Sequence, residues 1–227
     1  MLVLEELKSL AEQEYKAFNN KIIPTQQTTL GVRLPMLRKI ARRIAKEKPM
    51  AFIQSDKQNI FELIMLEGMV LSSMDKSFKE LLPLTETFLL KVDNWAQIDS
   101  SICDFKNITK EKKDVLVVVK KWLKSDKEFF VRAGLVMLLA HFVEKKNLQM
   151  IFDLSQSIVH TGYYAHMGNA WLVSCCMAKF PKETIIFFKN NTLDDKTHNK
   201  AIQKSRESFR VSKEDKIIIN ELKRLKR

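Results

Sequence analysis

The chain has 227 residues, which suits one large domain or an extended array with a continuous core. Its formal net charge of +12 makes nucleic acid the first partner to consider and an anionic membrane surface the second. Only five glycines and five prolines occur, and this shortage of turn-forming residues argues against many short strands and for long helices joined by short links.

The expected location follows from features that the sequence lacks. No apolar run reaches the length of a membrane span, and the acidic, amphipathic N-terminus is unlike a signal peptide. Cys103 stands alone and Cys175 and Cys176 are adjacent, so we expect neither a disulfide framework nor a metal site. These observations predict a cytoplasmic protein that needs no cofactor and does not enter a membrane.

The N-terminal part of the chain reads as a series of helices. Residues 2–18 form an amphipathic pattern that predicts one helix, and a polar connection follows. Gly31 supplies a turn, and Pro35 fits the first position of the next helix because its missing N–H costs nothing there. That helix is strongly basic, so its exposed face either meets phosphate or is simply solvated. Two more helices are predicted over residues 57–72 and 76–91.

The stretch from Asn94 to Asp104 carries the most specific pattern. On a helix, Trp95 and Asp99 lie four residues apart and therefore on one face, while Ile98 buries the helix against its neighbours. An indole beside a carboxylate suits a cationic aromatic guest. The alternative interpretation is a half-buried tryptophan beside a solvated aspartate.

The spacing of two later residues favours a site. Arg132 lies 37 residues after Trp95, and Trp171 lies 39 residues after Arg132. A spacing near 40 is the period of HEAT-type helical repeats, in which residues one period apart occupy equivalent places on neighbouring helices. The sequence therefore predicts an all-α solenoid formed by residues 1–227 as a single domain. Trp95, Asp99, Arg132 and Trp171 would line its concave surface.

The rest of the chain continues the helical pattern. A helix is predicted over residues 110–124, with Trp122 in the core, and Ser125 and Glu128 resemble a capping box that opens the helix containing Arg132. Residues 147–159 and 163–179 predict a further pair. A short helix is predicted to begin at Pro181, and Ser212 and Asp215 indicate a further helix start. His141 and His166 lie in or beside apolar runs, and we expect both to be structural.

The C-terminal tail is strongly basic. From Lys196 to Arg227 it holds eleven basic and four acidic residues, a net charge of +7. Lys196, Lys200 and Lys204 recur at four-residue steps and form a stripe on a helix. Such a stripe is either a track for phosphates or a basic cap that faces solvent.

Four motifs in this order resemble the AlkD-like DNA alkylation repair family, whose members are HEAT-like repeat DNA glycosylases. The resemblance covers about residues 5–210. The motifs are Gly31-Val-Arg-Leu-Pro-Met-Leu-Arg, Asn94-Trp-Ala-Gln-Ile-Asp, Phe129-Phe-Val-Arg-Ala and Tyr163-Tyr-Ala-His-Met-Gly-Asn-Ala-Trp.

The resemblance implies a solenoid whose concave, positive face holds duplex DNA, and an enzyme that removes cationic N3- and N7-alkylpurines without a deep base pocket. In that picture Asp99 is the catalytic carboxylate, which stabilises the oxocarbenium-like sugar and helps to place the attacking water. Trp95 and Trp171 match the aromatic pair that contacts the sugar and backbone of the lesion. The residues that we predict to contact DNA are Arg33, Arg38, Arg132, Tyr163, Lys200 and Lys204. The expected partner is double-stranded DNA, alkylated or branched, bound by a monomer.

Two departures from the family pattern are visible. Family glycosylases carry a short additional helix between the first helix and the Gly-Val-Arg turn, and this helix reaches into the minor groove. Here the polar residues 19–29 are too few for a helix and its two links, so the sequence predicts a divergent paralogue without that helix. Ser174 stands where an arginine is expected.

Three functions therefore remain open from the sequence. The first is an alkylpurine DNA glycosylase, and the second is a noncatalytic DNA-binding protein that keeps the cleft. The third is a scaffold for an acidic protein, which many α-solenoids are. Binding to plain duplex separates the first two from the third, and excision from methylated DNA separates the first from the second.

Overall fold

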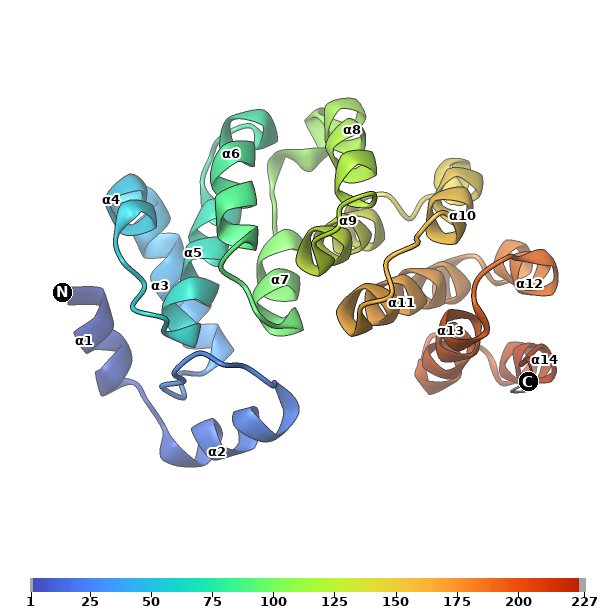
Figure 1. The fold of residues 1–227 in the computed structure, drawn as a ribbon, viewed down its shortest axis with the longest axis horizontal. Coiled ribbons are helices and arrows are strands. Elements are labelled where there is room, and N and C mark those ends of the chain that lie inside the picture. The colour runs from blue at the N-terminus through green and yellow to red at the C-terminus, as the bar shows by residue number, and fades with distance from the viewer. Residues whose placement is uncertain (1, 225–227) are drawn as a thin grey trace. The chain divides into compact units, whose positions relative to one another are not determined.

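The computed structural model describes residues 2–224 and confirms an all-α protein that is 72% helical (Figure 1). Over this range the only strand-like pairing is an isolated bridge between Thr28 and Ile60. None of the helices in the described range combines the length and apolar composition that crossing a bilayer requires. The last three residues of the predicted basic tail lie outside the described residues.

The chain divides into two compact units, one up to Val115 and the other from Leu116 onward, and helix α8 spans the division. The first unit contains α1 (Leu2–Ser9), α2 (Gln13–Ile22), α3 (Leu34–Glu47), α4 (Pro49–Gln54), α5 (Phe61–Ser73), α6 (Phe78–Leu89), α7 (Trp95–Ile102) and the 3₁₀ turn η1 (Asn107–Lys110). After α8 (Lys112–Trp122), the second contains α9 (Glu128–His141), η2 (Lys145–Asn147), α10 (Leu148–Gln156), α11 (Tyr163–Lys179), α12 (Pro181–Asn190), α13 (Asp195–Glu207) and α14 (Lys213–Glu221).

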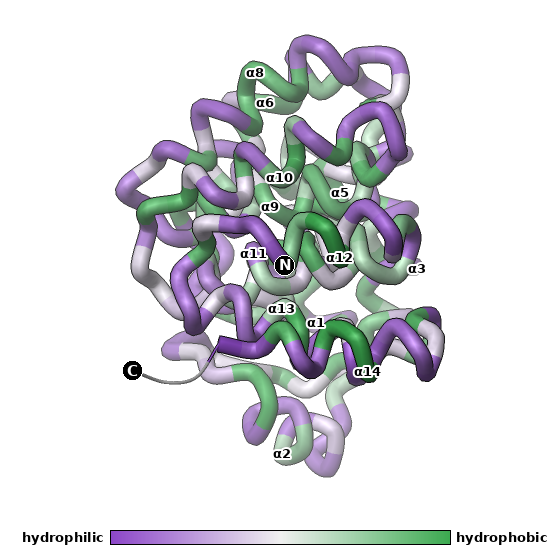
Figure 2. The backbone as a smooth tube through the Cα atoms, turned by 90° about the vertical axis from the view of Figure 1, so that its right-hand side faces the viewer, coloured by the Kyte–Doolittle hydropathy of each residue, from purple (hydrophilic) through white to green (hydrophobic). Residues whose placement is uncertain are grey.

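Each unit is built from two rows of helices, as an α-solenoid is. In the first unit α5 packs between α3 and α7, while α4 and α6 pack against it from a second row. In the second unit α11 packs between α9 and α13, with α10, α12 and α14 behind them. The central position of α5 explains why this helix is hydrophobic along most of its length (Figure 2). A helix that is covered on nearly all sides needs no polar face.

Helices α5 and α7 approach each other closely at Gly68. A Cβ atom at this position would lie 2.2 Å from the Ser101 hydroxyl oxygen and 2.5 Å from the Phe88 ring. Ile98 and Ile102 are fully buried on α7, which confirms the apolar face predicted for that helix. This contact fixes α7, and with it the side chains on its opposite face.

The prediction of one helix over residues 2–18 is wrong, because the chain breaks between α1 and α2. Glu12 has extended backbone angles, and its N–H donates to the carbonyl of Gly31 at 3.0 Å instead of to a helical carbonyl. The ten-residue helix α2 therefore occupies the interval between the first helix and the Gly31 turn. The expected absence of a helix from this interval is also wrong, since it rested on the same misplaced boundary.

The capping-box prediction at Ser125 and Glu128 is also wrong. The Ser125 hydroxyl accepts from the N–H of Lys127, and α9 begins at Glu128 without a side-chain cap. The Glu128 carboxylate instead accepts the N–H groups of Tyr164 and Ala165 at the first turn of α11. The helix start predicted at Ser212 is confirmed, since its hydroxyl accepts from the N–H of Asp215 at 3.0 Å.

Candidate functional site

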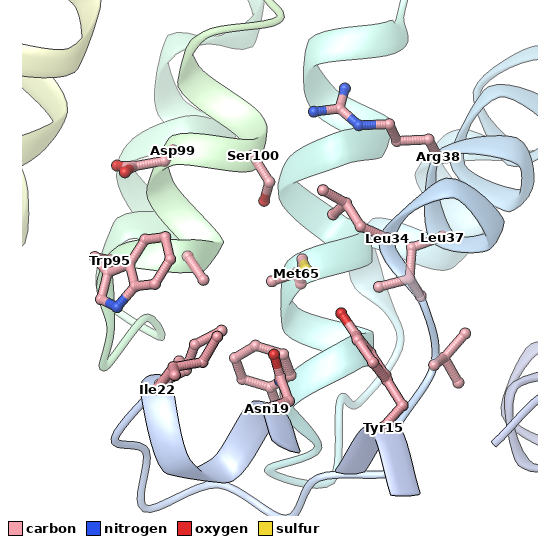
Figure 3. A pocket seen from close by; sticks show the side chains of 14 residues that line it. Tyr15, Asn19, Ile22, Leu34, Leu37, Arg38, Met65, Trp95, Asp99 and Ser100 are labelled. Carbon is pink, nitrogen blue, oxygen red and sulfur yellow. The ribbon is translucent and has the colours of Figure 1, made fainter. Parts of the chain in front are cut away.

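A pocket of about 350 Å³ opens in the first unit between α2, α3, α5 and α7 (Figure 3). Its walls are mostly apolar, and Trp95 and Asp99 stand one above the other on α7 at the edge opposite Arg38. Tyr15 and Asn19 rise from α2 and place a hydroxyl and an amide in the pocket. The other lining residues are Ile22, Ile23, Val32, Leu34, Leu37, Phe61, Met65, Ala96 and Ser100.

Asn94 fixes the first turn of α7 and therefore the position of Trp95. Its side-chain oxygen accepts the N–H groups of Ala96 at 3.0 Å and Gln97 at 3.3 Å, as an N-cap does. Its amide nitrogen donates to the carboxylate of Asp93 at 2.7 Å and to the side-chain oxygen of Gln97 at 3.1 Å. Because Asn94 and Gln97 are fully buried, these bonds are made without competition from water.

The same polar cluster ties the segment after α2 to α7. The Thr25 hydroxyl donates to the Asp93 carboxylate at 2.8 Å, and the Gln26 N–H donates to it at 2.7 Å. The Gln97 amide nitrogen donates to the side-chain oxygen of Gln27 at 2.6 Å. These bonds join residues about seventy positions apart. They hold α2, the floor of the pocket, against the helix that carries Trp95.

A buried carboxylate shapes the turn between α2 and α3. Glu62 on α5 is 1% exposed and accepts the N–H groups of Leu30 at 2.9 Å and Gly31 at 2.7 Å. Gly31 has a φ of +96°, and a Cβ there would lie 2.6 Å from the carbonyl oxygen of Glu12. Only glycine tolerates both this positive φ and this close approach of another backbone atom. The turn predicted at Gly31 is therefore confirmed.

Two of the predicted DNA-contacting arginines make ion pairs in the first unit. Arg33 donates to both carboxylate oxygens of Glu12, and its guanidinium lies 4.9 Å from the ring centre of Tyr15. This hydrogen bond holds the pKa of the Glu12 carboxyl below its ordinary value. Arg38 is paired with Asp104 at the far end of the pocket. Arg33 is exposed and Arg38 is half-buried.

In the second unit, Arg132 and Trp171 lie on the neighbouring helices α9 and α11. Arg132 is only 5% exposed, and its guanidinium donates to the carbonyl of Tyr164 at 3.1 Å. Trp171 is half-buried, whereas Tyr163 at the start of α11 is 60% exposed. The structure thus places Trp95 with Asp99 in the first unit and Arg132 with Trp171 in the second.

Helix α13 brings the predicted lysine stripe against α11. Lys196, Lys200 and Lys204 act electrostatically on His166, which is buried and bonded to the Thr197 hydroxyl at 2.8 Å. Burial lowers the pKa of His166, and the three cations lower it further against the opposing effect of Asp194. The stripe therefore lies along the helix that carries Trp171, and His166 has the structural role that we expected.

Sequence reasoning missed the contribution of α2 to the pocket. Tyr15 was included in a longer first helix and Asn19 in the polar connection after it, which gave no reason to place either residue beside Trp95. Glu12, whose charge interrupts the apolar pattern after Leu10, was the available sign of a break. Among residues 2–224, no three His, Cys, Asp or Glu side chains are grouped in a way that could hold a metal ion.

Comparison with known proteins agrees with this arrangement. Residues 3–174 match the family model described as DNA alkylation repair enzyme. A search of curated proteins found no match to the chain. The matched residues include both units' candidate residues up to Trp171, together with α2 and the pocket. The chain therefore belongs to the DNA alkylation repair enzyme family, and its role lies in DNA repair.

Proposed function

We propose that this protein is a DNA glycosylase that binds duplex DNA and hydrolyses the N-glycosidic bond of cationic N3- and N7-alkylpurines. The observation that carries the proposal is the pairing of Asp99 with Trp95 at the edge of a pocket, in a chain of a DNA alkylation repair family. The presence of α2 in the interval before Gly31 removes the main sequence-based argument for an inactive relative.

Cleavage of the N-glycosidic bond needs little assistance from the protein, because a positively charged purine is already a good leaving group. When the bond between C1′ and the purine nitrogen breaks, its electron pair leaves with the base, which becomes neutral. The deoxyribose keeps the positive charge, shared between C1′ and the ring oxygen. The Asp99 carboxylate stabilises this cation electrostatically. Water then adds through its oxygen to C1′, and its proton passes to the carboxylate.

The aromatic and basic residues would hold the DNA for this step. The indoles of Trp95 and Trp171 offer electron-rich surfaces to the sugar that bears the developing charge. Arg33, Arg38, Arg132, Tyr163, Lys200 and Lys204 would bind the backbone. Lys200 and Lys204 are half-buried on α13, beside the helix that carries Trp171.

Release of N7-methylguanine from a defined duplex, followed by chromatography, tests the catalytic role. Changing Asp99→Asn should lower the excision rate by roughly a hundredfold or more, because a preorganised charge of this kind is worth that much. Duplex affinity should change little. Asp153→Asn, at an exposed aspartate on α10, is the matched control and should excise normally. If the wild type and Asp99→Asn both release base only at the spontaneous rate, the glycosylase proposal fails.

A binding experiment tests the DNA interface separately. Each phosphate that the protein neutralises adds about 0.9 to the slope of log K against log salt concentration. Replacing Lys200 and Lys204 together by alanine should lower that slope by up to about 1.8 and weaken binding to all sequences alike. Duplex binding without excision would support the noncatalytic DNA-binding alternative. Absence of duplex binding even at low salt would favour a protein scaffold.

A further inference from the structure

The loop between α13 and α14 presents the most exposed large apolar side chain among the described residues. Phe209 is 103% exposed, whereas Val211, two residues later, is only 6% exposed. The loop is held at both ends, by the Ser208 hydroxyl, which accepts from the N–H of Arg210, and by Ser212, which caps α14. One face of the loop is therefore anchored in the unit while the phenyl ring points into solvent.

Three cationic residues lie close to Phe209 along the chain. Arg206, Arg210 and Lys213 lie within four residues of Phe209 and are all exposed. The acidic residues Glu207 and Glu214 belong to the same segment, but the Glu207 carboxylate already accepts from the Gln203 amide at 2.8 Å. An aromatic ring between arginines can stack on a base while the guanidinium groups bind the flanking phosphates.

The loop also adjoins the helix that carries Trp171. Cys175 follows Trp171 by four residues on α11, so the two half-buried side chains lie one turn apart on the same side. Arg210 contacts the Cys175 thiol, and Lys204 acts on it electrostatically. The cationic groups of the loop therefore continue the basic stripe of α13 past the end of the proposed DNA site in this unit.

We propose that loop residues 208–212, together with Arg206 near the end of α13, form a binding site for an unpaired DNA base. Phe209 stacks on a base that has left the double helix, and Arg206 and Arg210 bind the phosphates on either side of it. A base inside an intact duplex is already stacked on both faces, so a single ring at a loop tip can reach only a base at an end, a gap or an abasic position. This inference rests on the proposed function only in taking DNA as the ligand.

A membrane is a poorer match for the same loop. Only one apolar side chain points outward at the tip, because Val211 is turned into the unit. One inserted phenylalanine gives weak, reversible membrane attachment, and stable anchoring needs a second apolar anchor. Stacking on a base needs no more than one ring.

Fluorescence anisotropy with three labelled probes tests the proposal: a blunt duplex, the same duplex with a five-nucleotide single-stranded overhang, and single-stranded oligothymidylate. We expect the wild type to prefer the overhang to the blunt end. Phe209→Ala should weaken binding to the overhang and to the single strand on the order of tenfold, the factor that corresponds to about 1.4 kcal/mol of stacking. Binding to the blunt duplex should change less than twofold, and Phe209→Trp should keep the preference.

Ile186→Ala is the matched control, since Ile186 is an exposed apolar residue on α12 at 63% and should have no effect on any probe. If Phe209→Ala binds the overhang as tightly as the wild type, the proposal is overturned. It is also overturned if Phe209→Ala loses only attachment to vesicles containing phosphatidylserine. Phe209-dependent binding of the single strand without excision of alkylpurines would support this site while rejecting the glycosylase proposal.

Discussion

Removing the Asn94 side chain tests whether the buried polar cluster sets the position of α7. In Asn94→Ala the helix loses its N-cap, and the N–H groups of Ala96 and Gln97 lose their acceptor. The change also removes two donated hydrogen bonds, one to Asp93 and one to the side-chain oxygen of Gln97. All of this happens at a position with no solvent exposure, so water cannot replace the lost partners without entering the core.

The expected loss of stability follows from these four bonds. An N-cap contributes about 1 kcal/mol, and a buried group left without its partner costs about 1–3 kcal/mol. The second contribution lies at the low end, because the Asp93 carboxylate keeps its bonds from Thr25 and Gln26 and the Gln97 oxygen still accepts from the N–H of Asp93. We therefore expect the free energy of unfolding to fall by about 2–3 kcal/mol, which is a large share of the 5–15 kcal/mol typical of a domain.

Urea denaturation followed by circular dichroism measures this loss. Asn94→Ser, which keeps a capping oxygen but not the donor, should recover roughly 1 kcal/mol of it. Asn190→Ala is the control, because Asn190 is an exposed asparagine that makes one hydrogen bond within α12. If Asn94→Ala costs less than about 0.5 kcal/mol, or no more than Asn190→Ala, then the cluster does not hold α7 as we reason.

Three further changes probe other parts of the protein. Gly68→Ala should cost about 1–3 kcal/mol in a urea titration through overpacking, and adding Ser101→Ala should recover part of that loss, because the new methyl group meets the Ser101 hydroxyl. Glu62→Gln should destabilise by about 1–3 kcal/mol and speed hydrogen exchange at Gly31, since an amide cannot accept from every N–H that the carboxylate serves. Burial lowers the pKa of His166, so as the pH falls the unfolded chain protonates this histidine before the folded chain does. The stability present at neutral pH should therefore be lost below about pH 6.5, by at most about 1.4 kcal/mol per pH unit. Denaturation at several pH values should show a shallower decline in His166→Gln, and an unchanged decline would contradict this.

The fold could be predicted from the sequence where periodicity and spacing were unambiguous. The intervals of nearly 40 residues between Trp95, Arg132 and Trp171 placed them on α7, α9 and α11, and the structure confirms that these residues lie on three separate helices, α7 packed on α5 in the first unit and α9 packed on α11 in the second. The bounds 163–179 match α11, whose first residue follows a glycine and whose last precedes a proline by two positions. Such boundaries are local, so local patterns reveal them.

The parts that could not be predicted depend on partners distant in the chain. The break before α2 is made by a hydrogen bond from Glu12 to Gly31, and nothing near Glu12 specifies that bond. Glu128 has the spacing of a capping box, yet its carboxylate serves the first turn of α11, 36 residues later. In both cases a tertiary contact outweighs the local preference, and the pocket residues on α2 were missed for the same reason.

The anchoring of the turn by Glu62 also determines which substitutions this region can tolerate. The carboxylate binds main-chain N–H groups, so these hydrogen bonds do not depend on which side chains the turn carries. Leu30 and Val32 can therefore vary among residues of suitable size while the turn keeps its shape, whereas proline at either position would delete a donor. A saturation library across residues 30–32 should accordingly show a tolerant position on each side of an invariant glycine. Position 62 should accept glutamate almost alone, because aspartate is one methylene too short to reach the same N–H groups.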